Sequence, residues 1–175
     1  MNEPLAKVTD EMLPENKACE ICGHILTKKI HPEEEDLKEF IRALLGDRPF
    51  VKKYSLYNGQ YNLTYKTLIS SEASRLSMFL TKILTDDKLT KIEKRENVVK
   101  IKLLFYLESI NGVFISSPEE ESLELLLKRY AKDFESDSEN AISIYVKTLI
   151  QFLFLQKLLI EEGYDANFWK GAGLL

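Results

Sequence analysis

The sequence predicts an α+β fold that is mostly helical, with one β-hairpin inserted into a helical bundle at about residues 50–68. The hairpin is indicated by Asn58-Gly59, which stands between two runs rich in Tyr, Thr, Val and Leu. Both residues accept the positive φ angles of a type I′ turn at low cost. The helices are indicated by apolar stripes at helical spacing, with capping residues and acidic first turns at their starts.

The order of features along the chain predicts three segments. Residues 1–32 show little periodicity and contain a knuckle-like Cys-x-x-Cys turn, residues 33–163 form the helical domain with the hairpin, and residues 164–175 form an aromatic tail. The first helix is expected from Glu33 to Leu45, with acidic residues in its first turn and Gly46 as its C-terminal cap. Its apolar stripe consists of Leu37, Phe40, Ile41, Leu44 and Leu45.

With Asn58-Gly59 as the turn, Leu56 pairs with Tyr61 and Tyr54 pairs with Leu63. Alternation along the strands then gives the hairpin one apolar face and one polar face. The apolar face consists of Tyr54, Leu56, Tyr61, Leu63 and Tyr65. Because an isolated hairpin is marginal in water, helices or another chain must cover this face. Two interpretations stay open: a β-element packed on its own helices, or an edge that receives a partner's strand.

Four further helices are expected after the hairpin. The first is capped by Ser70 or Ser71 and runs to about Leu84, and the second runs from about Lys88 to Ser109, where Asn111-Gly112 stops it. Ser116-Ser117-Pro118 has the cap and N1 proline of a helix start, followed by acidic residues 119–121. The last helix is expected from about Ala141 to Glu162.

The last helix is apolar on nearly all sides, so it is either central in its own fold or covered by another chain. The tail that follows holds the only Trp of the chain, next to a Phe. This aromatic pair either forms a lid over the core or anchors the chain in a partner's pocket. The residues that we expect at a partner interface are Tyr57, Tyr61, Phe152, Phe154, Phe168 and Trp169. The surplus of apolar helix is also compatible with a homo-oligomer.

The N-terminal segment carries the most specific local motif, Cys19-x-x-Cys22-Gly23. This is the turn of a zinc knuckle, and His24 and His31 complete a set of four candidate ligands. His24 lies so close to Cys22 that four ligands around one ion would strain the short loop. Three interpretations stay open: a zinc site in the monomer, a knuckle that is vestigial or completed by a partner, and a plain turn.

Composition and motifs favour a protein without catalytic function. The chain of 175 residues has a net charge of −4, which argues against binding nucleic acid through bulk electrostatics. We expect no secretory signal and no apolar run long enough to cross a bilayer, so a reducing cytoplasm is the default. No phosphate-binding glycine loop, Gly-x-Ser-x-Gly or HExxH motif is present. We therefore expect no catalytic residue and, apart from the zinc ion considered above, no cofactor.

The order of these features resembles that of small proteins from the tail and baseplate of tailed bacteriophages, namely assembly chaperones and hub components. The resemblance is carried by Cys-x-x-Cys-Gly, Leu44 to Phe50, the Tyr54 to Gly59 hairpin with its return strand Leu63 to Leu68, and the ending Asn167 to Gly171. It implies a non-enzymatic protein that binds other phage tail or baseplate proteins, in the host cell cytoplasm or in the virion tail. The alternative is a small cytoplasmic zinc-knuckle adaptor. An enzyme that uses the cysteine pair is a weaker third interpretation, because no base stands near the pair.

Overall fold

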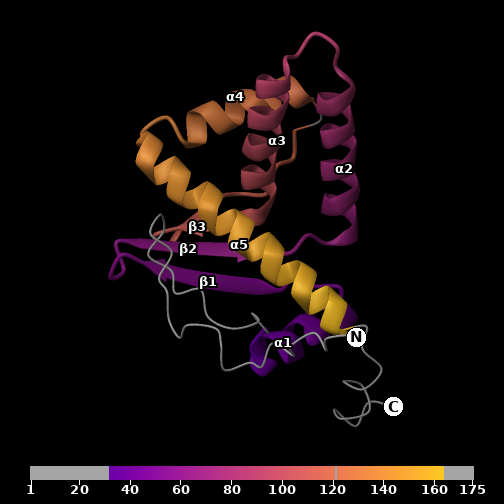
Figure 1. Ribbon diagram of the computed structural model, residues 1–175, viewed down its shortest axis with the longest axis vertical. Helices are drawn as coiled ribbons and strands as arrows, with labels where there is room; N and C mark the ends of the chain where they lie inside the picture. Colours follow the sequence, from indigo (N-terminus) through magenta and orange to yellow (C-terminus); the bar gives the residue numbers. More distant parts are fainter. Residues whose placement is uncertain (1–31, 121, 164–175) are drawn as a thin grey trace, which may run out of the picture. The chain divides into compact units, whose positions relative to one another are not determined.

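The structure, a computed structural model, describes residues 32–120 and 122–163. The described chain contains five helices and a four-stranded antiparallel sheet, which confirms an α+β fold that is mostly helical (Figure 1). The elements in chain order are α1 (Glu34–Leu45), β1 (Val51–Leu56), β2 (Tyr61–Lys66), α2 (Ser70–Thr85), α3 (Lys91–Tyr106), β3 (Leu107–Ile110), β4 (Val113–Phe114), α4 (Leu123–Asp133) and α5 (Glu139–Gly163).

The register of the predicted hairpin is confirmed, but its turn spans residues 57–60 and is thus two residues longer than Asn58-Gly59. Leu56 pairs with Tyr61 and Tyr54 pairs with Leu63 in the antiparallel ladder of β1 and β2. At the turn Asn58 has a φ of 56° and Gly59 a φ of 84°, so the backbone needs the left-handed conformation that these residues accept. The neighbouring Tyr57 is also left-handed, with a φ of 51°.

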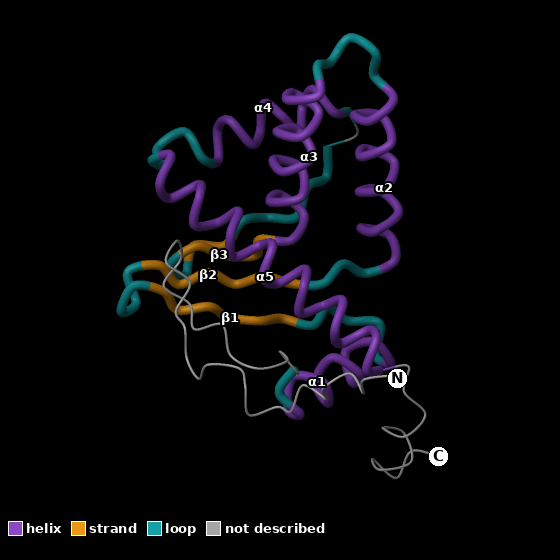
Figure 2. Tube along the Cα trace, viewed as in Figure 1, coloured by secondary structure: helices purple, strands orange, loops and turns teal. Residues whose placement is uncertain are grey.

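The sheet continues beyond the hairpin with two further strands, and the sequence does not predict these strands. The order of strands is β1-β2-β3-β4, and β3 pairs with β2 although α2 and α3 separate them in the chain (Figure 2). The helix predicted to reach Ser109 therefore ends at Tyr106, and this part of the prediction is wrong. The physical reason is that β2 needs a hydrogen-bonding partner on its second edge. Asn111 and Gly112, both with positive φ, form a second hairpin turn rather than a helix stop.

The sheet carries its core on the face that α5 crosses (Figure 1). The ring of Tyr65 stacks on that of Phe152 with 5.7 Å between centroids, and the Tyr65 hydroxyl donates to the carbonyl oxygen of Tyr145 at 2.7 Å. Tyr61 meets the Tyr145 ring edge to face at 6.4 Å. Among the described residues, the apolar face of the hairpin is thus covered by a helix of its own chain. Strand β3 pairs with the second edge of β2, whereas no described strand pairs with the outer edge of β1.

The first helix is joined to β1 by one ion pair and one aromatic contact. The Lys52 ammonium donates to both carboxylate oxygens of Asp36, at 2.7 and 2.6 Å, and the rings of Phe40 and Phe50 meet edge to face at 5.8 Å. The predicted bounds and the Gly46 cap agree with the structure to within one residue. The predicted stripe is wrong at its end, because the last turn extends beyond the packed surface. Leu44 and Leu45 are 66% and 72% exposed.

Two helix starts also differ from the sequence prediction. The residue before α2 is Ile69, whose amide donates to the Glu72 carboxylate at 3.3 Å, so neither Ser70 nor Ser71 is the cap. Helix α4 begins at Leu123, and the Ser122 hydroxyl accepts from the Leu125 amide at 3.2 Å. The segment 116–120 that was expected to start this helix is non-helical.

Candidate functional site

Helix α5 combines a buried side with apolar side chains that the described chain leaves exposed. One side of the helix is buried in the core, through Tyr145, Leu149 and Phe152. Its outer side exposes Ile150 and Phe154, at 61% and 47%, one helical turn apart. Most of its remaining apolar residues are half-buried. We call Ile150 and Phe154 the α5 stripe, and its apolar surface faces solvent in the described part of the chain.

The same helix is long and apolar enough to cross a membrane by length and composition alone. The sequence predicts no such segment. A single helix of this kind is weak evidence for a membrane span, because the central helix of a globular fold passes the same test. Here α5 contacts α1, α3 and β2 of its own chain, as a central helix does.

A pocket of about 360 Å³ lies where the C-terminal end of α5 approaches α1 and the loops that flank the hairpin. Its lining includes Phe40, Ile41, Leu44, Phe50, Ile160 and Gly163. The phenylalanines and Ile41 are buried, whereas Leu44 and Ile160 remain partly exposed. The volume lies in the range of pockets that hold a small ligand or one large side chain. This pocket and the α5 stripe are the candidate functional surfaces.

One polar group at this pocket, the Thr67 hydroxyl, serves the fold. The Thr67 hydroxyl, which lines it, accepts a hydrogen bond from the Phe50 amide at 2.8 Å. Asp47 and Arg48 lie on its lining as well, next to the end of α1. Over the part of the chain that the structure describes, no cluster of three His, Cys, Asp or Glu residues could hold a metal ion. The pocket is therefore suited to apolar contact.

The structure separates the predicted partner-binding residues into different environments. Tyr57 is 64% exposed at the hairpin turn, and its ring contacts that of Tyr61 at 6.1 Å. Tyr61 is half-buried between Tyr57 and the Tyr145 ring. Phe154 is exposed, but Phe152 is wholly buried, so its assignment to a partner interface is corrected. The helix rotates about 200° between these two phenylalanines, which places them on different sides.

Six further predicted site residues lie outside the described residues. They are the candidate zinc ligands Cys19, Cys22, His24 and His31, and the aromatic pair Phe168 and Trp169. The sequence does not predict the pocket or the exposure of Leu44 and Ile160. The one sequence feature that points to them is the pair of leucines directly before Gly46, in the last turn of the first helix.

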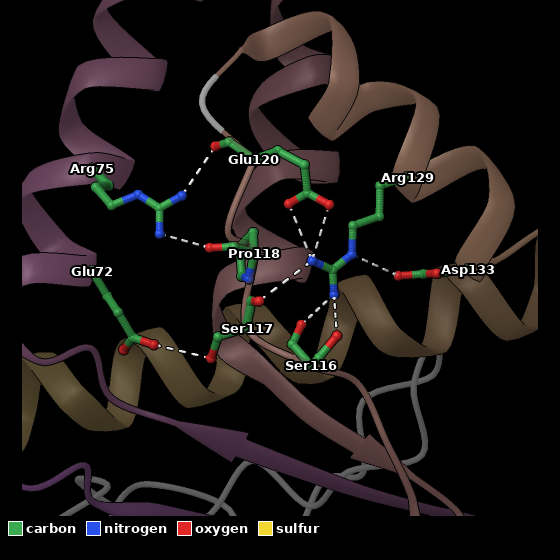
Figure 3. Close-up of polar contacts among 8 residues, drawn as sticks. All are labelled: Glu72, Arg75, Ser116, Ser117, Pro118, Glu120, Arg129 and Asp133. Atoms are coloured by element: carbon green, nitrogen blue, oxygen red, sulfur yellow. Dashed lines mark hydrogen bonds and ion pairs between the residues drawn. The ribbon is translucent and has the colours of Figure 1, made fainter.

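Two arginines hold the segment between β4 and α4 in place (Figure 3). Arg75 of α2 donates to the carbonyl oxygens of Pro118 and Glu120 at 2.7 and 3.0 Å. Arg129 of α4 donates to both carboxylate oxygens of Glu120 at 3.2 and 3.1 Å, to Asp133 at 3.1 Å, and to the hydroxyl and carbonyl oxygens of Ser116. We call this arrangement the arginine clamp.

The clamp resembles an anion site in composition but not in bonding. Burial alone raises the pKa of Glu120, but hydrogen bonds from backbone amides and from Arg129, together with the Arg129 charge, bring this pKa below its usual value. On the adjacent side, the Lys66 ammonium donates to Glu72 at 2.6 Å and to the Ser117 hydroxyl at 2.9 Å. Because protein acceptors already engage these cations, the clamp positions a loop and leaves no free donor set for a substrate.

This clamp explains why the strong helix-start signal at residues 116–118 is not used. The carbonyl oxygens of Ser116, Pro118 and Glu120 accept from arginines instead of from helical amides.

Comparison of the chain with protein-family models, with curated proteins and with solved structures finds no match in any of the three.

Proposed function

We propose that this chain is a non-enzymatic interaction component of bacteriophage tail or baseplate assembly, acting as a chaperone or as a structural subunit. Its partners are other tail or baseplate proteins, and its place is the host cell cytoplasm, the virion tail or both. The phage context comes from the sequence resemblance. The mode of action, apolar contact with other polypeptides, comes from the surface of α5 and the adjoining pocket.

One observation carries the proposal: on the outer side of α5, Ile150 and Phe154 lie one turn apart and are 61% and 47% exposed. Neighbouring apolar side chains that face water are typical of protein–protein interaction sites. Phe154 supplies an aromatic side chain of the kind that concentrates binding energy, and Ile150 lies beside it. Lys147 and Lys157, both exposed, flank the stripe as a polar rim does.

The proposal of a non-enzymatic role rests on how polar groups are used. Among the residues that the structure describes, no buried side-chain nitrogen or oxygen atom lacks a hydrogen-bond partner. Reaction centres typically hold polar groups poised for a substrate and shifted in pKa within a cleft. The pocket beside α5 is lined mainly by apolar side chains, with Thr67 already engaged by the backbone.

The test is co-purification from cells infected by the phage that encodes the chain. The tagged full-length protein is compared with the double variant Ile150→Ser/Phe154→Ser, and with Leu125→Ser as the control, because Leu125 is 52% exposed on α4. We expect proteins encoded by tail or baseplate genes to co-purify with the wild type and with the control but not with the double variant. Co-purification of metabolic enzymes instead, or equal recovery with all three proteins, would contradict the proposal.

The zinc-knuckle adaptor is the alternative, and metal content separates the two in part, because a tail component could also bind zinc. If the adaptor function is correct, one zinc ion per chain should be present in the purified protein and lost in Cys19→Ser. A protein without zinc removes the basis of the adaptor. Mass spectrometry of purified virions then decides between a chaperone, absent from the particle, and a structural subunit.

A further inference from the structure

A second surface, away from the pocket beside α5, combines an apolar floor with a cationic rim. It lies at the junction of α2 and α3, measures about 550 Å³, and is lined by Leu84, Lys91, Lys94, Arg95, Val98 and Val99. We call it the α2–α3 groove. Figure 1 shows α2 and α3 side by side, joined by a loop. Leu84, at the end of α2, is 59% exposed, and both valines are half-buried.

The cations of the groove stand where helix electrostatics disfavour them. Lys91 is the first residue of α3, and Arg95 follows one helical turn later. Positive charge is unfavourable at the positive end of the helix dipole, and like charges four residues apart repel each other. These positions therefore do not serve the stability of α3, which suggests that they serve the binding of something acidic.

Two acidic side chains near the groove, Glu93 and Glu96, contact residues other than Lys91 and Arg95. The Glu93 carboxylate accepts from the Thr90 amide at 2.8 Å and from the Thr90 hydroxyl at 2.7 Å, as part of the cap of α3. Glu96 lies 3.8 Å from the Lys100 ammonium. Within residues 32–120 and 122–163, no ion pair joins a carboxylate to Lys91 or Arg95.

The floor is held in place by the third cation. The Lys94 ammonium donates to the carbonyl oxygen of Leu84 at 2.9 Å, at the C-terminal end of α2. This bond satisfies a carbonyl at a helix end, where positive charge is favourable. Lys94 therefore has a structural role, and Lys91 and Arg95 are the cations available at the rim.

We infer that the α2–α3 groove binds an acidic amphipathic helix of a partner polypeptide. The apolar side of that helix would contact Leu84, Val98 and Val99, and its carboxylates would pair with Lys91 and Arg95. From Lys91 to Val99 the groove spans ~12 Å along α3, which matches about two turns of a docked helix. The inference rests on the proposed function of binding polypeptides, and it adds a second contact surface and the charge of the partner. An aromatic stacking platform, as in single-strand nucleic-acid sites, is not part of this lining.

The test measures binding of a fluorescein-labelled helical peptide of about 15 residues, long enough to form a helix on a surface. The peptide has a Leu stripe at i, i+3 and i+4 spacing and Glu elsewhere, and a matched peptide has Lys in place of each Glu. The full chain is compared with Lys91→Glu/Arg95→Glu. The control, Lys53→Glu/Lys132→Glu, changes the net charge equally at two exposed lysines outside the groove.

We expect the Glu peptide to bind the wild type and the control alike, and to bind the groove variant roughly tenfold or more weakly, as expected for reversal of two rim charges. The Lys peptide should bind much more weakly than the Glu peptide, and added salt should reduce the difference. The groove variant is expected to fold, because glutamates at a helix start suit the dipole.

Three results would overturn the inference. The first is that the groove variant and the control variant weaken binding of the Glu peptide equally. The second is that the wild type binds the Glu and Lys peptides equally, and the third is that the wild type does not bind the Glu peptide. A different set of results would assign the groove to a membrane surface instead. In that case the Glu peptide does not bind, the wild type binds preferentially to vesicles of anionic lipid, and the groove variant loses this vesicle binding. Because these variants leave Ile150 and Phe154 intact, co-purification through the α5 stripe tests the proposed function separately.

Discussion

Replacing Phe152 with Ala is expected to destabilise the protein far more than replacing Phe154, although both are phenylalanines of one helix. Phe152 is wholly buried, stacked on Tyr65 and 6.2 Å from the ring of Tyr106 between centroids. Phe154 is 47% exposed on the α5 stripe. The two substitutions remove the same atoms, so their difference measures the environment of each position.

The magnitude follows from burial. Truncation of a buried phenylalanine to alanine typically costs about 3–5 kcal/mol, because the lost transfer free energy adds to the cost of the cavity. Phe152 belongs at the upper part of that range, since two aromatic rings lose their partner at once. Truncation of an exposed side chain typically changes the free energy of unfolding by about 0.5 kcal/mol, and for the half-exposed Phe154 we expect less than about 1 kcal/mol.

The assay is equilibrium unfolding in urea followed by far-ultraviolet circular dichroism, since α5 and its partners make the protein mostly helical. With a slope near 2 kcal/mol per molar urea, the transition midpoint of Phe152→Ala should fall by ~2 M, and that of Phe154→Ala by less than ~0.5 M. Equal shifts, or a larger shift for Phe154→Ala, would refute the placement of the helix on the sheet.

Three further outcomes are expected from single contacts. Burial, the nearby Asp137 carboxylate and Tyr61, and a hydrogen bond to Asp137 raise the pKa of Tyr145 to about 12 from an ordinary value of 10.0. The neutral Tyr145 side chain therefore contributes fully to the free energy of unfolding below pH 10, and this contribution is lost as the pH rises toward 12. Tyr145→Phe should make alkaline unfolding, monitored by circular dichroism, less steep. Arg129 uses one nitrogen for both Glu120 oxygens and its other two for Asp133 and Ser116, and a lysine with its single nitrogen cannot hold all three partners. Arg129→Lys should therefore cost about 1–2 kcal/mol in thermal unfolding and speed amide exchange over residues 115–120; unchanged exchange there would contradict the clamp. Gly59→Ala should cost about 1–2 kcal/mol in urea unfolding because the φ of Gly59 is 84°. Gly46→Ala should cost less, because Gly46 has a φ of −92° and the one tight contact of an added Cβ is the Arg42 carbonyl oxygen at 3.2 Å. The reverse order would count against the turn.

The hairpin could be predicted from the sequence because all its information is local. Asn58-Gly59 fixes the turn, the turn fixes the register, and the alternation of Tyr54, Leu56 and Tyr61 fixes the buried face. The first helix was predictable for the same reason, since its acidic first turn and Gly46 mark both ends.

The errors lie where distant contacts override local signals. Residues 107–110 continue an apolar helical pattern, but the free edge of β2 takes them into the sheet. The helix start at Ser116 is strong locally, yet Arg75 and Arg129 bind the carbonyl oxygens that a helix would use. No local pattern records the position of an arginine twelve or more residues away.

The candidate surfaces were predictable only in part. The apolar character of the last helix was evident from its composition, but which side faces solvent depends on where the helix meets the sheet. That contact places Phe152 inside and Phe154 outside. The pocket involves α1, the hairpin and α5 together, so it exists only in the folded chain.

The bond between the Tyr65 hydroxyl and the Tyr145 carbonyl joins residues 80 positions apart, and this has a consequence during synthesis. At about 5–20 residues per second, a ribosome needs roughly 4–16 s to advance from one to the other. Throughout that interval the aromatic side of the emerging hairpin has no helix to cover it. We expect neighbouring nascent copies on one messenger RNA to associate through this uncovered side, so the yield of soluble protein should fall as ribosomes become denser on the message.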